Sequence, residues 1–133
     1  MMKRMAMIKN FLIINCIGDN DKLGLRINKE FFIHNLNKEK NDSEKLVKEI
    51  HEFLNKHNVV PDENFTVIVN QGPGSFSGIR VSLAVAKGLE ISKKVKLFGY
   101  LNTNLKVFDE ENIIKLIDNN LIEKNLIKPI YLS

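Results

Sequence analysis

The first third of the chain has the hydrophobic pattern of three short strands. Residues 11–17 form a continuous apolar run that is typical of a buried strand, and turn-forming residues 18–21 follow it. Apolar and polar residues then alternate over residues 23–28, which indicates a half-buried second strand. Residues 31–35 continue the pattern after another polar turn. We therefore expect a three-stranded antiparallel meander.

The period changes from two to that of a helix after residue 42. Residues 43–57 place apolar side chains at helical spacing between lysines and glutamates, and Asn41 or Asp42 can cap the helix. Residues 65–70 are apolar enough for a central strand. Three more elements complete the prediction, namely a helix over residues 77–92, a strand over 95–100 and a helix over 110–126 with a possible break near Asn119 and Asn120.

The helix over residues 77–92 is apolar on nearly every side, although a helix that covers a sheet needs only one apolar stripe. Its additional apolar surface must therefore pack against the first helix or against a partner. The candidate contact residues are Val81, Val85 and Leu89 in this helix and Val47, Ile50 and Leu54 in the first. Three small residues, Ser82, Ala86 and Gly88, allow another helix to approach closely.

The order of these elements is that of one ribonuclease-H-like α/β lobe, a meander followed by parallel strands that helices flank. A length of 133 residues fits a single domain, residues 1–133. The composition, 44% hydrophobic and 27% charged, excludes collagen-like and wholly disordered chains. The fold class expected is therefore α/β, with one hydrophobic core.

Charge and cysteine content limit the binding partners and the cellular compartment that we expect. The formal net charge is only +4, there is no Trp, and the lysines are scattered, which argues against sequence-specific nucleic-acid binding. Cys16 is the only cysteine, so no intramolecular disulfide forms, as in a reducing compartment. No apolar run reaches the ~18 residues that span a bilayer, and the run at residues 11–14 is too short for a signal peptide. We expect a cytoplasmic protein without a membrane partner.

A glycine-rich segment, residues 71–78, joins the fourth strand to the second helix. Backbone N–H groups at such a place can bind an anion, and the candidates are Gly72, Gly74, Ser75, Ser77 and Gly78. However, Ile79 stands where a P-loop needs Lys, and Ser77 where a dinucleotide motif needs Gly. The structural alternative is that the glycines permit a tight turn and close packing while Ser75 or Ser77 caps the helix.

Other chemistry-bearing residues give weaker signals. His34, His51 and His57 lack metal-ligand spacing and are expected at the surface, so no metal or cofactor is predicted. Cys16 lies inside an apolar strand and is expected to be an inert thiol. Arg80 falls in the first turn of a helix, where the dipole disfavours a cation. Its partner is expected to be either an internal carboxylate or a residue of another subunit.

The glycine-rich segment also carries a family resemblance. Its residues, Q-G-P-G-S-F-S-G-I-R at 71–80 followed by A-K-G-L at 86–89, resemble the G-P-G-S-F-T-G-L-R and A-K-G-L signature of the TsaB (YeaZ) family. The apolar opening strand and the P-I-Y-L ending at residues 129–132 fit that family too. The resemblance implies an actin-like ATPase fold and a role in tRNA threonylcarbamoyladenosine modification.

The resemblance further implies a non-catalytic subunit. TsaB-like proteins hold and activate a paralogous catalytic subunit, TsaD, in a complex that includes the ATPase TsaE. They use the two helices described above, and they commonly form homodimers through the same surface when TsaD is absent. Arg80 and the six apolar residues on the two helices are therefore the expected interface. We also expect residues 129–132 to return to the domain, because they are too apolar to lie free in water.

Two departures from the family pattern change the expectation. The chain runs from Tyr100 and Leu101 into what resembles the family's terminal helix, so we expect the second lobe of the family to be missing. Asn15 and Cys16 stand where the family has Asp-Thr, and Ser133 stands where it has Arg. Because Asn15 cannot act as a charged ligand or base, ATPase activity is not expected. The alternative function is that of an enzyme of the same superfamily, a peptidase-like hydrolase or a nucleotide-dependent phosphotransferase.

Overall fold

The computed structural model describes residues 8–18, 20–36, 42–124 and 127–130. These residues form a mixed sheet of six strands in the order β3-β2-β1-β4-β5-β6. The strands are β1 (Phe11–Asn15), β2 (Lys22–Ile27), β3 (Glu30–Asn35), β4 (Thr66–Asn70), β5 (Lys96–Tyr100) and β6 (Ile122–Glu123). The predicted α/β class is confirmed.

The predicted meander is also confirmed. β2 pairs antiparallel with both β1 and β3, and Leu12 lies opposite Leu25. On its other side β1 pairs parallel with β4, where Leu12 lies opposite Val67, and β4 pairs parallel with β5. The strands β1 and β4 therefore lie at the centre of the sheet, where both faces are buried, and this burial explains why their sequences are continuous apolar runs.

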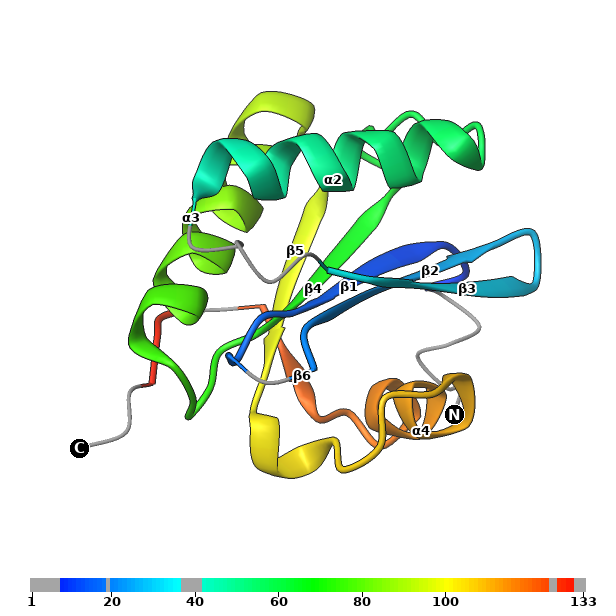
Figure 1. Ribbon diagram of the computed structural model, residues 1–133. Coiled ribbons are helices and arrows are strands. Elements are labelled where there is room, and N and C mark those ends of the chain that lie inside the picture. Colours follow the sequence, from blue (N-terminus) through cyan, green and yellow to red (C-terminus); the bar gives the residue numbers. More distant parts are fainter. Residues whose placement is uncertain (1–7, 19, 37–41, 125–126, 131–133) are drawn as a thin grey trace.

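Three helices cover the two faces of the sheet (Figure 1). α2 (Ser43–Lys56) and α3 (Phe76–Lys93) lie on one face, and α4 (Glu110–Asp118) lies on the other. A short 3-10 helix, Asn102–Asn104, follows β5. α2 begins where the sequence predicted, because the Asp42 carboxylate accepts a hydrogen bond from the Glu44 N–H at 2.9 Å.

The alternation of side chains along β1 divides the interior into two clusters. Leu12 and Ile14 belong to the cluster beneath α2 and α3, whereas Phe11 and Ile13 belong to the cluster beneath α4. All four side chains are fully buried. Successive strand residues point to opposite faces, so one apolar strand serves both sides of the sheet.

The helix predicted over residues 110–126 is too long, but its predicted break near Asn119 and Asn120 is confirmed. α4 ends at Asp118, and Asn120 adopts a left-handed backbone with a φ of 61°. Residues Ile122 and Glu123 then form β6 and pair antiparallel with β5. The helix ends because Asn tolerates the left-handed conformation, and because pairing with β5 buries Ile122 to 2% exposure. Leu126 lies outside the described residues.

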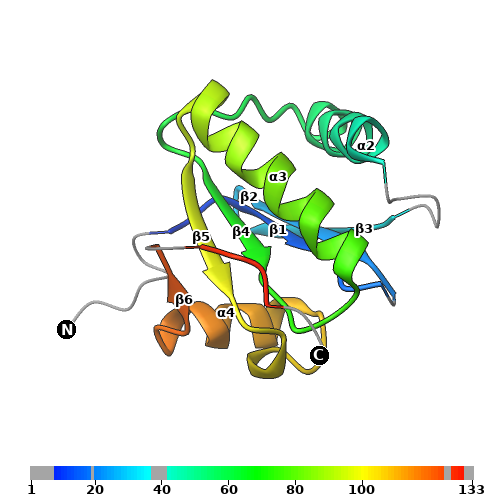
Figure 2. The ribbon, with the colours of Figure 1, turned by 90° about the vertical axis from the view of Figure 1, so that its left-hand side faces the viewer.

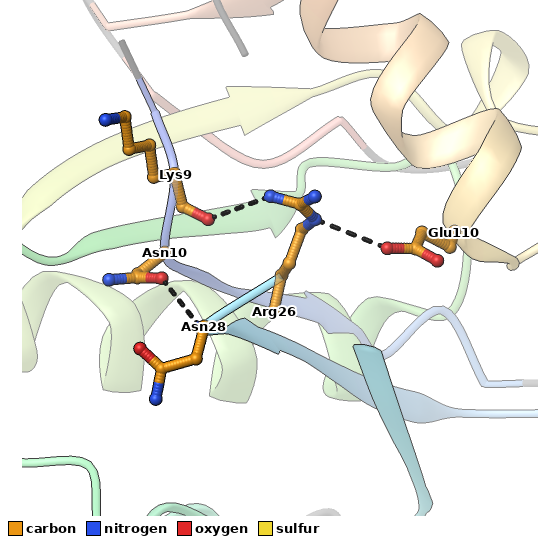
Figure 3. Close-up of polar contacts among 5 residues, drawn as sticks. All are labelled: Lys9, Asn10, Arg26, Asn28 and Glu110. Carbon is orange, nitrogen blue, oxygen red and sulfur yellow. Dashed lines mark hydrogen bonds and ion pairs between the residues drawn. The ribbon is translucent and has the colours of Figure 1, made fainter. Parts of the chain in front are cut away.

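Polar contacts join β2 to α4 and to the chain before β1 (Figure 3). The Arg26 guanidinium donates to the Glu110 carboxylate at 3.3 Å and to the Lys9 carbonyl at 3.2 Å. Beside it, the Asn28 N–H donates to the Asn10 side chain at 3.3 Å. Arg26 therefore connects α4 to the sheet.

The end of the chain returns to the sheet, as expected. The Ile130 N–H donates to the Gln71 carbonyl at 2.8 Å, and the Gln71 side chain donates to the Lys128 carbonyl at 3.0 Å. Ile127 is 7% exposed and belongs to the cluster beneath α3. The return is confirmed for the segment that ends at Ile130, while residues 131–133 lie outside the described part. Of the helices in that described part, none has the length and apolar character needed to cross a bilayer.

Candidate functional site

The glycine-rich segment 71–78 packs directly against the turn between β1 and β2. The Ser75 N–H donates to the Ile17 carbonyl at 2.7 Å. A Cβ atom added to Gly74 would lie 2.8 Å from the Cβ of Ile17, closer than real side chains approach. Gly74 is therefore required so that the two backbones can touch.

This contact favours the structural interpretation of the glycines over an anion site. The backbone of Ile17 takes up the space beside the loop and already accepts the hydrogen bond of the Ser75 N–H. Gly72 has a φ of 101°, and a Cβ there would collide with the Ile130 carbonyl. Side-chain capping by Ser75 or Ser77 was the wrong part of that interpretation. Ser75 occupies the N-cap position, but its side chain makes no capping hydrogen bond.

Three asparagines meet where the parallel strands β1, β4 and β5 end. The Asn70 side-chain amide donates to the side-chain oxygens of Asn15, at 2.7 Å, and Asn102, at 3.1 Å. The Asn70 oxygen accepts from the Gly72 N–H at 2.8 Å, and the Tyr100 hydroxyl donates to Asn15 at 3.4 Å. We call Asn15, Asn70, Asn102 and Tyr100 the amide cluster.

The amide cluster is electrically neutral. Burial raises the pKa of the Tyr100 hydroxyl well above its ordinary value of 10.0, because the phenolate would lose its hydration. The asparagine side chains do not titrate. The cluster therefore lacks the ionised carboxylate that phosphate and metal chemistry would use at this edge of the sheet.

Sequence reasoning singled out Asn15 but missed Asn70 and Asn102. Their positions along the chain could have identified them, because Asn15 and Asn70 each end a parallel strand and Asn102 follows the third parallel strand. The carboxyl ends of neighbouring parallel strands meet at one edge of a sheet, where ligands commonly bind in open α/β folds.

The second feature is an apolar groove of about 580 Å³ between α2, α3 and the loop after α2. Val47 and Val60 lie in its wall with exposures of 50% and 81%. The other lining residues are Ser43, Ile50, His51, Leu54, Asn55, Val59, Pro61, Ala84, Val85, Gly88, Leu89, Ser92 and Lys93. We call this hollow the α2–α3 groove.

The structure divides the predicted interface residues into buried and exposed ones. Ile50, Leu54 and Val85 are at most 7% exposed and join α2 and α3 to the sheet. Val81 and Leu89 are partly buried against the same cluster. Of the two alternatives, packing of the second helix on the first is therefore observed for these residues, while contact with a partner stays a prediction. Among the predicted interface residues, Val47 is the one with a large exposed apolar area in the groove.

The three small residues of α3 differ in position. Ser82 and Ala86 are fully buried beneath the helix and present no surface to a partner. Gly88 lines the groove, and a Cβ added there would meet no atom within 4 Å. Gly88 alone among them leaves open space for another helix.

Among the residues that the structure describes, Arg80 contacts an aromatic ring and forms no ion pair with a carboxylate. Its guanidinium carbon lies 5.2 Å from the centre of the exposed Phe76 ring, one turn earlier in α3. This cation–π contact explains how a cation is tolerated near the helix start.

The histidines pack between elements more than expected. His57 stacks on Phe32 of β3 with ring centroids 3.9 Å apart, and His34 contacts the Glu49 carboxylate of α2 at 3.1 Å. His51 is exposed and contacts Asn55 at 3.1 Å. Within the described ranges no group of His, Cys, Asp or Glu could hold a metal ion.

Comparison with known proteins places this fold and site in a family. The model of the family described as "TsaD: tRNA N6-adenosine threonylcarbamoyltransferase" matches residues 36–103, which include α2, the glycine-rich segment and α3. The class is therefore that of α/β proteins related to this transferase family. Within the class, the chain belongs to the TsaB (YeaZ) family.

Individual relatives agree with this assignment. The chain is 36% identical over 76 residues to the tRNA threonylcarbamoyladenosine biosynthesis protein TsaB of Buchnera aphidicola subsp. Baizongia pistaciae, covering 54% of this chain and 34% of the relative. It is 31% identical over 58 residues to TsaB of Bacillus subtilis, covering 44% of this chain and 25% of the relative. The matches thus span about a third or less of the curated relatives.

Solved structures show the same fold. YeaZ from Pseudomonas aeruginosa superposes with a TM-score of 0.64 at 15% identity, covering 72% of this chain and 45% of that one. A second structure, described as an uncharacterized protein with similarity to peptidase YEAZ from the same species, has the same TM-score and covers 44% of its chain. At this identity the likeness concerns the fold alone.

Proposed function

We propose that the chain is a non-catalytic scaffold subunit in tRNA threonylcarbamoyladenosine biosynthesis. In this proposal it binds and activates a TsaD-like catalytic paralogue through the α2–α3 groove, in a complex that can include a TsaE-like ATPase. Membership of the TsaB family supports the pathway. The open apolar groove is the observation that carries the binding role.

The groove has the character of a helix-binding surface. Val47 and Val60 expose apolar area beside Gly88, where nothing occupies the space above the backbone. Polar groups of His51, Asn55 and Lys93 border it. Two partner helices packed on α2 and α3 would form a four-helix arrangement with ridge-into-groove contacts and bury about 800 Å² or more on each side.

The same surface would serve self-association when no catalytic paralogue is present. A twofold dimer places identical patches against each other, so an apolar groove on one copy is covered by the same groove on the next. We therefore expect the isolated chain to be a homodimer that α2 and α3 hold together.

The neutral amide cluster supports a role without catalysis. Asn15, Asn70 and Asn102 satisfy one another at the strand ends, and the glycine-rich segment is closed onto Ile17. The chain would then be a single ribonuclease-H-like, actin-like lobe, for which the sheet order β3-β2-β1-β4-β5 is the support. A cytoplasmic location follows from the proposed tRNA pathway.

Two assays test this proposal. Co-expression with the TsaD-like protein of the same organism should yield a complex that survives affinity purification and gel filtration. The purified chain alone should neither hydrolyse ATP nor cleave peptides. Steady ATP hydrolysis that is lost in a Ser75→Ala variant with an unchanged melting temperature would contradict the scaffold role and support the enzymatic alternative.

A further inference from the structure

The excess of positive over negative charge falls within one stretch of sequence, although the lysines themselves are scattered along the chain. Residues 80–96 carry five cations and one carboxylate, a net charge of +4 that equals the net charge of the whole chain. The cations are Arg80, Lys87, Lys93, Lys94 and Lys96, and the carboxylate is Glu90. The rest of the chain is therefore neutral in sum, and the excess lies on α3 and the start of β5.

A second hollow lies beside this charged helix. It has a volume of about 330 Å³ and is lined by Lys87, Glu90, Leu97, Lys124, Ile127 and Lys128. Figure 2 shows the segment 127–130, in red, passing beside α3. Leu97 and Ile127 are buried and form an apolar floor, while the lysines are exposed. We call this hollow the lysine groove.

The lysine groove has an uncompensated positive charge. Three lysines face one glutamate, and none of the three forms an ion pair with a carboxylate in the ranges that the structure describes. All three side chains are exposed, so their charges are available to an anionic ligand. Such a groove raises the local concentration of anionic ligands.

The outer face of α3 extends this positive surface into a row. Arg80 and Lys87 are seven residues apart, so they share one face of α3 at an interval of about 10.5 Å, and Lys94 follows as the left-handed cap at the end of the helix. Phe76, 55% exposed, lies at the start of the row against Arg80. A line of cations with an exposed aromatic ring is the pattern that binds single-stranded nucleic acid, by phosphate contacts and base stacking.

We propose that the lysine groove and the adjoining face of α3 bind the phosphate backbone of RNA without reading its sequence. Lys87, Lys124 and Lys128 would each contact a phosphate as point charges, and their position on the apolar floor leaves the ammonium groups outermost. The choice of RNA rests on the proposed function, in which tRNA is the molecule that is modified. The binding of a phosphate backbone, in contrast, is inferred from the lysine charges alone.

The lysine groove and the α2–α3 groove lie on different flanks of α3. Lys87 and Glu90 line the former, whereas Val85, Gly88 and Leu89 line the latter. A protein partner and an RNA strand can therefore bind at the same time. Arg80 belongs both to the cationic row and to the predicted protein interface, so it is left unchanged in the test.

The test measures binding of fluorescently labelled tRNA to the chain alone by anisotropy, between about 50 and 200 mM salt. The test variant carries Lys87→Gln, Lys124→Gln and Lys128→Gln. Since each phosphate contact contributes about 0.7–0.9 to the slope of log affinity against log salt, the slope should fall by about 2 to 3. Affinity should fall by at least about tenfold at the lower salt concentration.

A matched variant controls for the loss of net charge. Lys29, Lys56 and Lys106 are exposed and lie outside the lysine groove, so changing all three to Gln removes the same charge elsewhere. This control should keep its affinity within about twofold. Equal weakening in both variants, or no binding by the unaltered chain, would overturn the proposal.

Two further results separate this proposal from its alternatives. If polyglutamate of equal charge competes as well as RNA does, the groove is a site for an acidic protein and the RNA proposal is wrong. Complex formation with the TsaD-like protein is measured separately. A complex that forms while RNA binding fails refutes this inference alone, and RNA binding without a complex refutes the proposed scaffold role.

Discussion

Gly78 and Gly88 lie in the same helix but in opposite surroundings. A Cβ on Gly78 would come within 2.9 Å of the Cys16 carbonyl oxygen, a backbone atom that cannot move aside cheaply. A Cβ on Gly88 would meet nothing within 4 Å. One glycine is therefore required by packing in the fold, and the other keeps a surface open.

This difference predicts opposite effects of the same substitution. Gly88→Ala should raise the free energy of unfolding by up to about 1 kcal/mol, since Ala is the better helix former and no clash opposes it. Gly78→Ala should lower it by about 1–3 kcal/mol through overpacking. Urea unfolding of the two variants measures both changes. The measurement is made on the monomer, at a protein concentration below that of self-association. Destabilisation of the monomer by Gly88→Ala would show that the space above that residue is filled by the chain itself.

The buried hydroxyl of Tyr100 should make the folded chain less stable at alkaline pH. Burial raises the pKa of its hydroxyl in the folded state above the ordinary value of 10.0, so the folded form favours the neutral phenol. The contribution of the neutral Tyr100 hydroxyl to the free energy of unfolding is fully present below pH 10. It is lost at higher pH, by up to about 1.4 kcal/mol per pH unit. Thermal melts of the unaltered chain and Tyr100→Phe should diverge above pH 10. Parallel curves would contradict the raised pKa.

At the scale of single residues, the sequence showed the polar positions but not their partners. The cluster of Asn15, Asn70 and Asn102 depends on three strands that are far apart in sequence ending side by side. The stacking of His57 on Phe32 and the contact of Arg80 with Phe76 depend on rotamers that no periodicity encodes. Asp42 was predicted as a cap because capping is local.

At the scale of elements, periodicity predicted all strands of the meander, both parallel strands and the starts of the helices to within about one residue. It failed at the end of α4, where apolar residues continue past Asn119 and Asn120. The outcome there depends on pairing between β6 and β5, a contact that local spacing cannot reveal. The return of residues 129–132 was predicted from their hydrophobicity, because apolar side chains avoid water, and the structure confirms it as far as Ile130.

The last segment is expected to stabilise the fold measurably. Deleting residues 129–133 would remove the hydrogen bond from Ile130 to the Gln71 carbonyl and uncover Gly72, whose surface Ile130 covers. We expect a loss of about 1–3 kcal/mol, observed as a lower melting temperature. An unchanged melting temperature would mean that this segment contributes nothing to the domain.

At the scale of the whole molecule, one layer of the α/β fold carries both proposed surfaces. α3 separates the α2–α3 groove from the lysine groove, while α4 on the opposite face closes the second core. The family could be predicted from the motif at residues 71–80, and the groove from the excess apolar surface of α3. Which residues of that apolar surface stay exposed could not be predicted from the sequence. The burial of Val85, Ile50 and Leu54 depends on how α2 crosses α3.

The central claim is that the α2–α3 groove binds the TsaD-like catalytic paralogue, and sedimentation velocity of the two mixed proteins tests it most directly. Val47→Glu and Gly88→Phe would put a charge or a bulky ring into the groove at positions that are exposed or open, so both variants should stay folded. Val107→Glu is the control, since Val107 is 56% exposed and lies outside the groove.

The account predicts a one-to-one complex for the unaltered chain and for Val107→Glu, with affinity reduced by at least about tenfold in Val47→Glu and Gly88→Phe. The melting temperatures of all four proteins serve as the check on folding. Equal binding by all four, or no complex with the unaltered chain, would contradict the account.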